Sequence, residues 1–187
     1  QSRLVTWLPL YHDMGLIGGL LMPLYTGVPV TALSPMAFPQ RPLRWLRPIA
    51  ATRATHGGGP NFAYELCARR ISDEEKQGLD LSSWETAYNG AEPIRPETLS
   101  RFAQAFAACG FRAEAFLPCY GLAEVTVGTA WAARGQRPRL SELRASALRE
   151  GRAEPSSDPA DHTAIVSCGP IVVVPDGEAL DRLAARA

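Results

Sequence analysis

The amino-acid sequence predicts an α/β fold, in which a largely parallel, layered sheet is flanked by helices. Short apolar or β-branched segments, typical of buried strands, alternate with amphipathic segments typical of helices. Sixteen glycines and sixteen prolines among 187 residues indicate many tight turns between these elements. Hydrophobic residues make up 46% of the chain and charged residues 20%, which is enough apolar material for a buried core and argues against a disordered chain.

Three apolar segments open the chain. Residues 3–10 are predicted to form a short buried strand, and residues 28–33, which are β-branched and follow a turn glycine, a second strand. Residues 13–22 are apolar almost all round, which is typical of a buried helix. This order of strand, helix and strand begins the α/β alternation.

Prolines mark the next two helices. Pro42 is expected to open a helix over 42–53 and Pro60 a second helix, because proline lacks an amide hydrogen that the first helical turn does not use. The segment 55–60 between them holds three consecutive glycines and is expected to be a loop. The residues expected to face inward are Leu43, Leu46, Ile49 and Ala50 in the first helix and Phe62, Ala63, Leu66 and Cys67 in the second.

The middle of the chain continues the alternation. Residues 72–75, Ser-Asp-Glu-Glu, have the capping-box pattern and predict a short helix over 73–78. A strand is expected at 84–88, a loop at 89–94, and then an amphipathic helix that opens at Pro96. The apolar face of that helix consists of Leu99, Phe102, Ala103 and Phe106.

Strands are also expected near 114–118 and over 125–131. A β-branched run returns at 163–174, and residues 178–186 are expected to form a final helix.

The polar composition of one segment suggests a division of the chain. Residues 134–162 are rich in Arg, Ser, Pro and Asp, with a helix predicted over 141–149, and are interpreted as an insertion or linker. They separate a main part, residues 1–133, from a second strand-rich part, residues 163–187, whose C-terminal end has a divergent sequence.

Charge and hydropathy exclude several classes of protein. Nineteen basic residues balance nineteen acidic ones, so the net charge does not favour nucleic acid or an anionic membrane as a partner. No apolar stretch approaches the roughly 18 residues that cross a bilayer, and the first ten residues lack a signal-peptide pattern. We therefore expect a cytoplasmic protein without membrane insertion. Because the sequence starts without Met, we expect it to be a section of a longer chain.

Cysteine and lysine usage restrict the chemistry. The cysteines are widely spaced and form no CxxC pair, which disfavours a zinc site or a disulfide framework and favours reduced, mostly buried thiols. They are Cys67, Cys109, Cys119 and Cys168. Eighteen of the basic residues are arginines and one is a lysine, Lys76. A mechanism that needs a lysine must use Lys76 or a lysine outside these residues.

Four clusters with potential chemistry follow predicted strands, although the chain has no GxSxG elbow, HExxH pair, phosphate-binding GxxxxGK[ST] loop or GxGxxG turn. They lie at 11–15, 56–62, 89–93 and 120–126. Ligands of α/β sheets bind beyond the carboxyl ends of strands. These clusters are therefore the candidate site.

Each cluster taken alone also has a purely structural explanation. His12 can be a satisfied core histidine beside Asp13 as a helix cap, and the glycine run can be an irregular turn. The Asn-Gly pair at 89–90 is common in turns. Tyr120 can be a core aromatic, and Glu124 either a surface carboxylate or a ligand of a hard cation such as Mg²⁺.

Taken together, the four clusters are far more specific. They comprise WLPLYHDMGLIGG (7–19), HGGGPNFAYELC (56–67), YNGAEPI (88–94) and CYGLAEVT (119–126). In this order and spacing they resemble the acyl-adenylate-forming superfamily and, more closely, its fatty acyl-AMP ligases, over about residues 1–170. The resemblance implies part of the large N-terminal domain of such an enzyme. It further implies the activation of a fatty acid with ATP and Mg²⁺, and transfer to an acyl carrier protein, separate or in the same polypeptide of a synthase.

The resemblance also implies roles for single residues. By this resemblance, His12 helps hold the substrate carboxylate and the α-phosphate, Tyr120 stacks on the adenine, and Glu124 binds the Mg²⁺ that bridges to phosphate. Alanine at 123, where many superfamily members carry threonine, favours fatty acyl-AMP ligases. The remaining nucleotide-binding residues are Gly90, Ala91, Glu92, Gly121, Leu122 and Ala123, and the acyl tunnel is walled by Gly59, Pro60, Asn61 and Phe62.

Several parts of that family have no counterpart here. We expect its Gly/Ser/Thr-rich phosphate loop before residue 1, and its ribose-binding aspartate and lysine-bearing lid after residue 187. The sequence leaves the family pattern after Gly169. We therefore expect an internal fragment that is inactive by itself. The alternatives are a coenzyme A ligase, an amino-acid adenylation domain, or a non-catalytic acyl-binding remnant.

Overall fold

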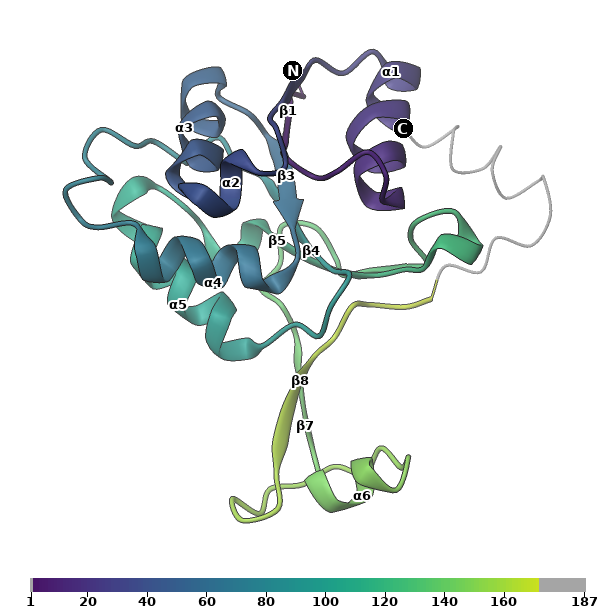
Figure 1. Ribbon diagram of the computed structural model, residues 1–187. Coiled ribbons are helices and arrows are strands. Elements are labelled where there is room, and N and C mark those ends of the chain that lie inside the picture. Colours follow the sequence, from purple (N-terminus) through teal and green to yellow (C-terminus); the bar gives the residue numbers. More distant parts are fainter. Residues whose placement is uncertain (1, 172–187) are drawn as a thin grey trace.

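The computed structural model describes residues 2–171, and its main part is a six-stranded sheet flanked by helices (Figure 1). The strand order is β2-β1-β3-β4-β5-β6, and only β6 is antiparallel to its neighbour. The strands are β1 (Leu4–Thr6), β2 (Val30–Ala32), β3 (His56–Gly59), β4 (Thr86–Asn89), β5 (Phe116–Tyr120) and β6 (Ala130–Trp131). This arrangement confirms the predicted α/β fold with a largely parallel sheet.

Four of the predicted strands are present with shifted ends. The observed β1, β2, β4 and β5 fall within or next to the segments 3–10, 28–33, 84–88 and 114–118. A single 3₁₀ turn, Ala113–Ala115, leads into β5. The prediction for 125–131 is corrected, because only Ala130–Trp131 form a strand there, after a 3₁₀ turn at Ala123–Val125.

The glycine-rich segment 55–60 was predicted to be a loop, and this is wrong. Its residues His56–Gly59 form β3, between β1 and β4. A Cβ atom on Gly58 would lie 2.2 Å from the Tyr88 carbonyl oxygen, and one on Gly59 would lie 2.9 Å from the Trp7 ring. Glycine is required in this strand because neighbouring groups occupy the space of a side chain.

Three of the predicted helices are confirmed. They are α3 (Leu43–Thr52), α4 (Asn61–Arg70) and α5 (Pro96–Phe106), and a short helix α2 (Ala37–Gln40), which the sequence did not indicate, precedes them. All four lie on one face of the sheet (Figure 1), where α4 packs against α5. Their apolar faces enclose a core rich in aromatic residues, with Trp45, Tyr64, Trp84, Phe102, Phe106 and Phe116 fully buried.

Phe62 is corrected, because it was expected to face inward and is 44% exposed. Its position in the first turn of α4 places the ring at the margin of the core, beside Trp7 and Phe38.

The apolar segment 13–22 was predicted to be a buried helix; it is helical, but the predicted burial is wrong. Met14–Leu21 form a π-helix, η1, which continues into α1 (Met22–Thr26) on the other face of the sheet (Figure 1). Leu16, Leu21, Met22, Leu24 and Tyr25 are exposed. Small or ring-closed residues make the contact with the sheet, since the buried positions are Gly15, Gly19 and Pro23.

The predicted helix over 73–78 is a series of turns instead. Ser72 and Glu75 do exchange the two hydrogen bonds of a capping box, each at 3.3 Å. The chain does not continue as a helix, and Gly78 adopts a φ of 73°. The capping pattern therefore predicted the local hydrogen bonds correctly but not the helix.

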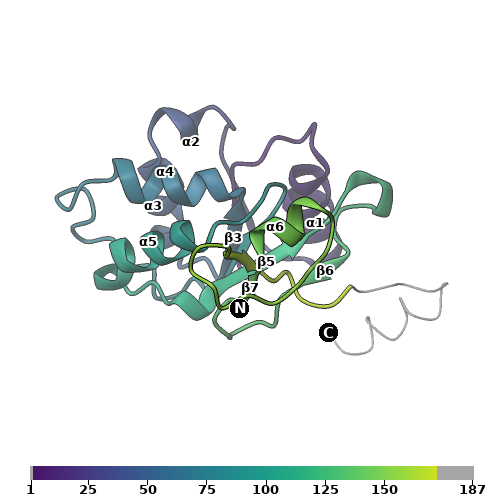
Figure 2. The same ribbon diagram turned by 90° about the horizontal axis from the view of Figure 1, so that it is seen from below.

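Residues after β6 form an arm that leaves the main sheet (Figure 1). In the arm, β7 (Leu140–Leu143) pairs antiparallel with β8 (Thr163–Val166), and α6 (Ala145–Arg149) follows β7. The helix predicted over 141–149 is therefore a strand in its first part. Viewed from below, α6 and β7 overlap the main sheet (Figure 2), as expected for an arm that projects from it.

The division of the chain at 134 and 163 stays a prediction, although β8 pairs with β7 across the second boundary. The helix expected over 178–186 and the end of the run 163–174 lie outside the described residues. Among the residues that are described, none of the helices has the length and hydropathy to cross a membrane.

Candidate functional site

The four candidate clusters follow strands that run in the same direction. Strands β1, β3, β4 and β5 are parallel neighbours, so their carboxyl ends lie at one edge of the sheet. Residues 11–15 follow β1, 60–62 follow β3, 90–92 follow β4, and 121–124 follow β5. The fold thereby brings together segments that are more than 100 residues apart, at the edge where α/β sheets bind ligands.

After β1, His12 and Asp13 form a close pair. The His12 Nδ1 atom lies 2.7 Å from Asp13 Oδ1. The Met14 amide donates to the same carboxylate at 2.6 Å, so Asp13 also caps η1, as predicted. The His12 side chain is half exposed, which excludes a core histidine.

After β3, the residues expected to form the acyl wall pack against aromatic side chains. The Phe62 ring centroid lies 6.1 Å from that of Trp7, in an edge-on arrangement, and 6.2 Å from that of Phe38. Gly59 lies directly against the Trp7 ring, and Pro60 is the N-cap residue of α4. The exposed face of Phe62 is therefore a rigidly supported apolar surface.

Asn61 is largely buried and serves the packing of two helices. Its Oδ1 accepts a hydrogen bond from the Arg95 amide at 3.1 Å, and its Nδ2 donates to Thr98 Oγ1 at 3.3 Å. This side chain ties the start of α4 to the start of α5.

After β4, the loop Gly90–Glu92 has a constrained backbone. A Cβ atom on Gly90 would lie 2.7 Å from Cys119 Sγ, so only glycine fits closely against β5. Ala91 adopts a left-handed φ of 67°, which is uncommon for an L-residue and is often found at binding sites. Glu92 Oε1 accepts a hydrogen bond from the Phe62 amide at 2.5 Å.

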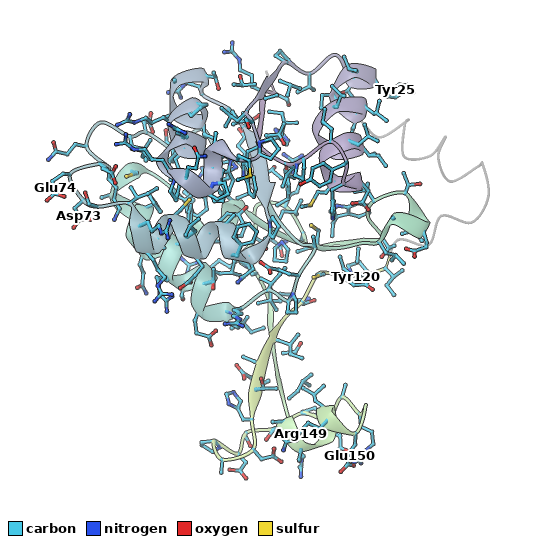
Figure 3. All side chains as sticks on the ribbon, viewed as in Figure 1. Tyr25, Asp73, Glu74, Tyr120, Arg149 and Glu150 are labelled. Carbon is cyan, nitrogen blue, oxygen red and sulfur yellow. The ribbon has the colours of Figure 1, made fainter. Side chains whose placement is uncertain are left out.

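After β5, an aromatic ring and a carboxylate point outward. The Tyr120 side chain is 58% exposed at the end of the strand (Figure 3), so a face of the ring is available for stacking and the residue is not a core aromatic. A Cβ atom on Gly121 would lie 1.8 Å from the Val127 carbonyl oxygen. Leu122 precedes the 3₁₀ turn that begins at Ala123, and within residues 2–171 the exposed carboxylate of Glu124 has no hydrogen bond or ion pair.

Several residues of the quoted clusters were given no role from the sequence. The Trp7 indole nitrogen, the Tyr88 hydroxyl and both amide atoms of Asn89 are buried without a hydrogen-bond partner among the described residues. Asn89 was expected in an Asn-Gly turn, and it is instead the last residue of β4, directly before the Gly90 loop. Trp7 offers no signal of a role in the sequence, because an apolar residue in a strand is expected to be core.

The thiols at this edge and in the core are protonated at neutral pH. Burial raises the pKa of Cys119, which lies under Gly90, to about 12, and burial also raises the pKa of Cys67. Neither cysteine is therefore an activated nucleophile.

Among the described residues, no three His, Cys, Asp or Glu side chains converge on a metal position. Surface hollows of about 530 and 370 Å³ occur elsewhere, the larger lined by Glu85, Arg112, Glu114, Ala115, Arg134 and Gly135. Neither hollow contains a residue of the four clusters.

Comparison with known proteins shows the family to which the chain belongs. The profile of the family described as AMP-binding enzyme matches residues 1–176. A medium-chain-fatty-acid–[acyl-carrier-protein] ligase of Moorena producens is 48% identical over 173 residues, which are 91% of this chain and 29% of that protein. A ligase of the same description from Teredinibacter turnerae is 43% identical over 164 residues, 88% of this chain and 26% of that protein.

A solved structure of similar fold contains ligands. The fatty acyl-adenylate ligase of Legionella pneumophila, in complex with acyl adenylate and pyrophosphate, superimposes with a TM-score of 0.88 and 45% identity. The match covers 92% of this chain and 30% of that one. This chain thus spans less than a third of each of these relatives. By the extent of the profile match and the identity to these relatives, the chain belongs to the AMP-binding enzyme family.

Proposed function

We propose that this chain is the acyl- and adenine-binding part of a fatty acyl-AMP ligase that activates a fatty acid with ATP. The observation that carries the proposal is the placement of the four clusters after four neighbouring parallel strands. The names of the relatives from M. producens, T. turnerae and L. pneumophila support a fatty acid as substrate and acyl adenylate as product.

In the proposed reaction, a carboxylate oxygen of the fatty acid attacks the α-phosphorus of ATP. The bond from the α-phosphorus to the bridging oxygen breaks, and pyrophosphate leaves with the electron pair. His12 is proposed to contact the carboxylate and the α-phosphate, and the support for this role is its half-exposed side chain, which is paired with Asp13 at 2.7 Å. The protein contributes alignment and charge stabilisation, so no nucleophilic side chain is needed.

The residues present fit an adenine and an apolar chain. The exposed Tyr120 ring provides a stacking surface, and the loop Gly90–Glu92 allows close approach from the neighbouring strand end. The exposed face of Phe62 provides an apolar wall supported by Trp7. Pro60 and Asn61 shape this wall through the start of α4, rather than by free side-chain groups.

The fit for Mg²⁺ is limited to one carboxylate. Glu124 is exposed and unpaired within residues 2–171, and no further carboxylate converges on it. A hard cation accepts such an oxygen ligand together with phosphate oxygens, so the ion is best understood as arriving with ATP. Bound there, it supplies charge neutralisation of the phosphates.

The direct test is fatty-acid-dependent release of pyrophosphate by the natural polypeptide that carries this sequence. We expect release with fatty acids of medium or long chain, and loss of most activity in His12→Ala and Glu124→Ala. Equal release with an amino acid in place of the fatty acid would point to an amino-acid adenylation domain. Binding of fatty acid without release of pyrophosphate would point to a non-catalytic remnant.

We further propose an acyl carrier protein as the acceptor, with cytoplasmic localisation. Incubating the loaded enzyme with a carrier protein or with coenzyme A distinguishes the two acceptors. Acyl transfer to the phosphopantetheine thiol of the carrier is expected. Transfer to free coenzyme A at an equal rate would instead identify a coenzyme A ligase.

A further inference from the structure

The loop Gly90–Glu92 and the residues that follow it are joined to the first turn of α4 by two hydrogen bonds. Glu92 Oε1 accepts a hydrogen bond from the Phe62 amide at 2.5 Å. Three residues further on, the Arg95 amide donates to Asn61 Oδ1 at 3.1 Å. In the first hydrogen bond a loop side chain accepts from the helix backbone. In the second, a helix side chain accepts from the backbone of the segment that follows the loop.

The two segments are adjacent because their strands are adjacent. Gly59 pairs with Asn89 at the ends of β3 and β4, so α4 and the loop begin side by side. The N-cap of α4 is Pro60, which makes no side-chain cap hydrogen bond. Glu92, 30 residues along the chain from Phe62, supplies the missing acceptor, and its negative charge is favourable near a helix N-terminus.

The conformation of the loop needs such support. Ala91 holds a left-handed φ of 67°, which is disfavoured for a residue with a side chain. Gly90 is wedged against Cys119 on one side, and the capping bond of Glu92 holds the loop on the other. The Glu92 carboxylate therefore binds the backbone of α4. We assign it this structural role rather than contact with a nucleotide base.

We propose that Glu92 is a positioning residue that couples the adenine loop to the acyl wall by capping α4. The inference rests on the proposed function, which places adenine against residues 90–92 and the fatty chain against Phe62. A nucleotide that orders the loop also fixes the Phe62 backbone through the cap. Because coupling between two binding sites is reciprocal, a bound fatty acid equally favours the nucleotide-bound loop.

The test uses the natural polypeptide that carries this sequence, with the variants Glu92→Ala and Glu92→Gln. The matched control is Glu97→Ala, an exposed carboxylate in the first turn of α5. Hydrogen exchange at the Phe62 amide reports the cap directly. We expect exchange about tenfold faster in Glu92→Ala, with most of the protection recovered in Glu92→Gln, whose amide oxygen still accepts a hydrogen bond.

The coupling itself is measured as fatty-acid affinity with and without AMP. We expect AMP to tighten fatty-acid binding at least fivefold in the wild type and in Glu97→Ala. In Glu92→Ala this factor falls to near one, and Glu92→Gln restores the larger part of it. A residue that acted only on global stability would change the melting temperature but not this ratio.

Three outcomes would overturn the inference. The first is an unchanged rate of hydrogen exchange at the Phe62 amide in Glu92→Ala. This outcome can be measured whether or not the polypeptide is a ligase. The second is wild-type coupling in Glu92→Ala while pyrophosphate release persists. The third is loss of discrimination between ATP and GTP in both Glu92 variants with intact fatty-acid affinity, which would show direct contact with the base. Absence of both ligand binding and pyrophosphate release in the wild type overturns the proposed function instead.

Discussion

At the scale of single residues, the groups that lie close to the backbone decide which positions accept a side chain larger than that of glycine. Gly57, Gly58 and Gly59 form the middle strand of the parallel sheet, and the groups beside them come from both faces. The Tyr88 ring approaches Gly58, whereas Trp84 and Ile49 approach Gly57 from the core. The Trp84 indole nitrogen also donates to the Gly57 carbonyl at 3.2 Å, so the strand and the aromatic core position each other.

Gly58→Ala is expected to lower the free energy of unfolding by about 3 kcal/mol or more, because the added methyl would lie 2.4 Å from the Tyr88 ring and 2.2 Å from its carbonyl oxygen. The matched control is Gly18→Ala in η1, where no other group lies within 4 Å of the new methyl. That variant is expected to be neutral or slightly stabilising. Urea unfolding of both proteins measures the difference, and equal midpoints would contradict the assigned packing of β3.

Cys119 is expected to resist alkylation. Its pKa of about 12 lies several units above that of a free thiol, because the side chain is buried beside the Asn89 carbonyl. At pH 8 the thiolate fraction is then roughly a thousandfold lower than in the unfolded chain. Iodoacetamide labelling followed by mass spectrometry, with and without urea, measures this protection. Equal labelling rates in the two states would show that the loop Gly90–Glu92 does not cover the thiol.

At the scale of elements, α4 and α5 are joined by a buried polar relay. Asn61 Nδ2 donates to Thr98 Oγ1, which donates to Glu65 Oε2 at 3.1 Å, and Arg101 pairs with the same carboxylate. Thr98 is buried at the start of α5, so this relay fixes how the two helices meet at the site. The position of the Phe62 wall therefore depends on α5 as well as on α4.

Thr98→Val is expected to destabilise the fold by about 1–3 kcal/mol, because it retains the shape of the side chain but leaves the Asn61 amide without its acceptor. Ser100→Ala, on the exposed side of α5, is the control and is expected to change stability by less than about 0.5 kcal/mol. Thermal unfolding followed by circular dichroism compares the two. A Thr98→Val protein as stable as the control would show that the relay contributes nothing to the helix pair.

The elements also differ in how well local sequence predicted them. Helices α3, α4 and α5 each begin at or just after a proline and present an apolar stripe, and both signals are local. The loop predicted for β3 and the burial predicted for η1 were wrong, because both features depend on contacts with distant residues. In η1 the glycines pack against Pro9 and Thr6, which leaves the large apolar side chains outside.

At the scale of the whole molecule, the one lysine lies away from the candidate site. Lys76 pairs with Asp73 at 2.9 Å and lies 5.2 Å from the centre of the Phe106 ring. It follows α4, which begins at the edge of the clusters and leads back toward the opposite edge, where β4 starts. Figure 3 shows Asp73 and Tyr120 on opposite sides of the molecule.

The 187 residues by themselves are therefore expected to show no fatty-acid-dependent release of pyrophosphate. The described edge lacks a lysine, and the chain spans less than a third of the relatives that it matches. The measurement is a coupled pyrophosphate assay with ATP, Mg²⁺ and fatty acids of several lengths. Adding a full-length relative to the same mixture is the positive control. Robust turnover by the isolated chain would contradict both the fragment interpretation and the placement of Lys76.

The residues of the candidate site could be proposed from the sequence because four short motifs, in their order and spacing, together resemble one family. The His-Asp, Gly-Ala-Glu and Tyr-Gly-Leu-Ala-Glu segments each keep their reactive types within five residues. Their roles stay predictions, since the described structure contains the strand edge but no ligand contact. The capping of α4 by Glu92 could not be predicted, because a hydrogen bond across 30 residues leaves no periodic pattern in the sequence.

The sequence by itself determined the α/β class, the helices that follow prolines, and the order of the four clusters. These features depend on residue propensities and spacings within a few residues, which can be read from a short segment of the sequence. Only the tertiary structure decided that the glycine run is the middle strand, that η1 exposes its apolar side chains, and that Glu92 binds a helix from a neighbouring strand. The physical reason is that each of these depends on close approach between distant segments, where occupied space and unpaired backbone groups, rather than hydropathy, select the residue.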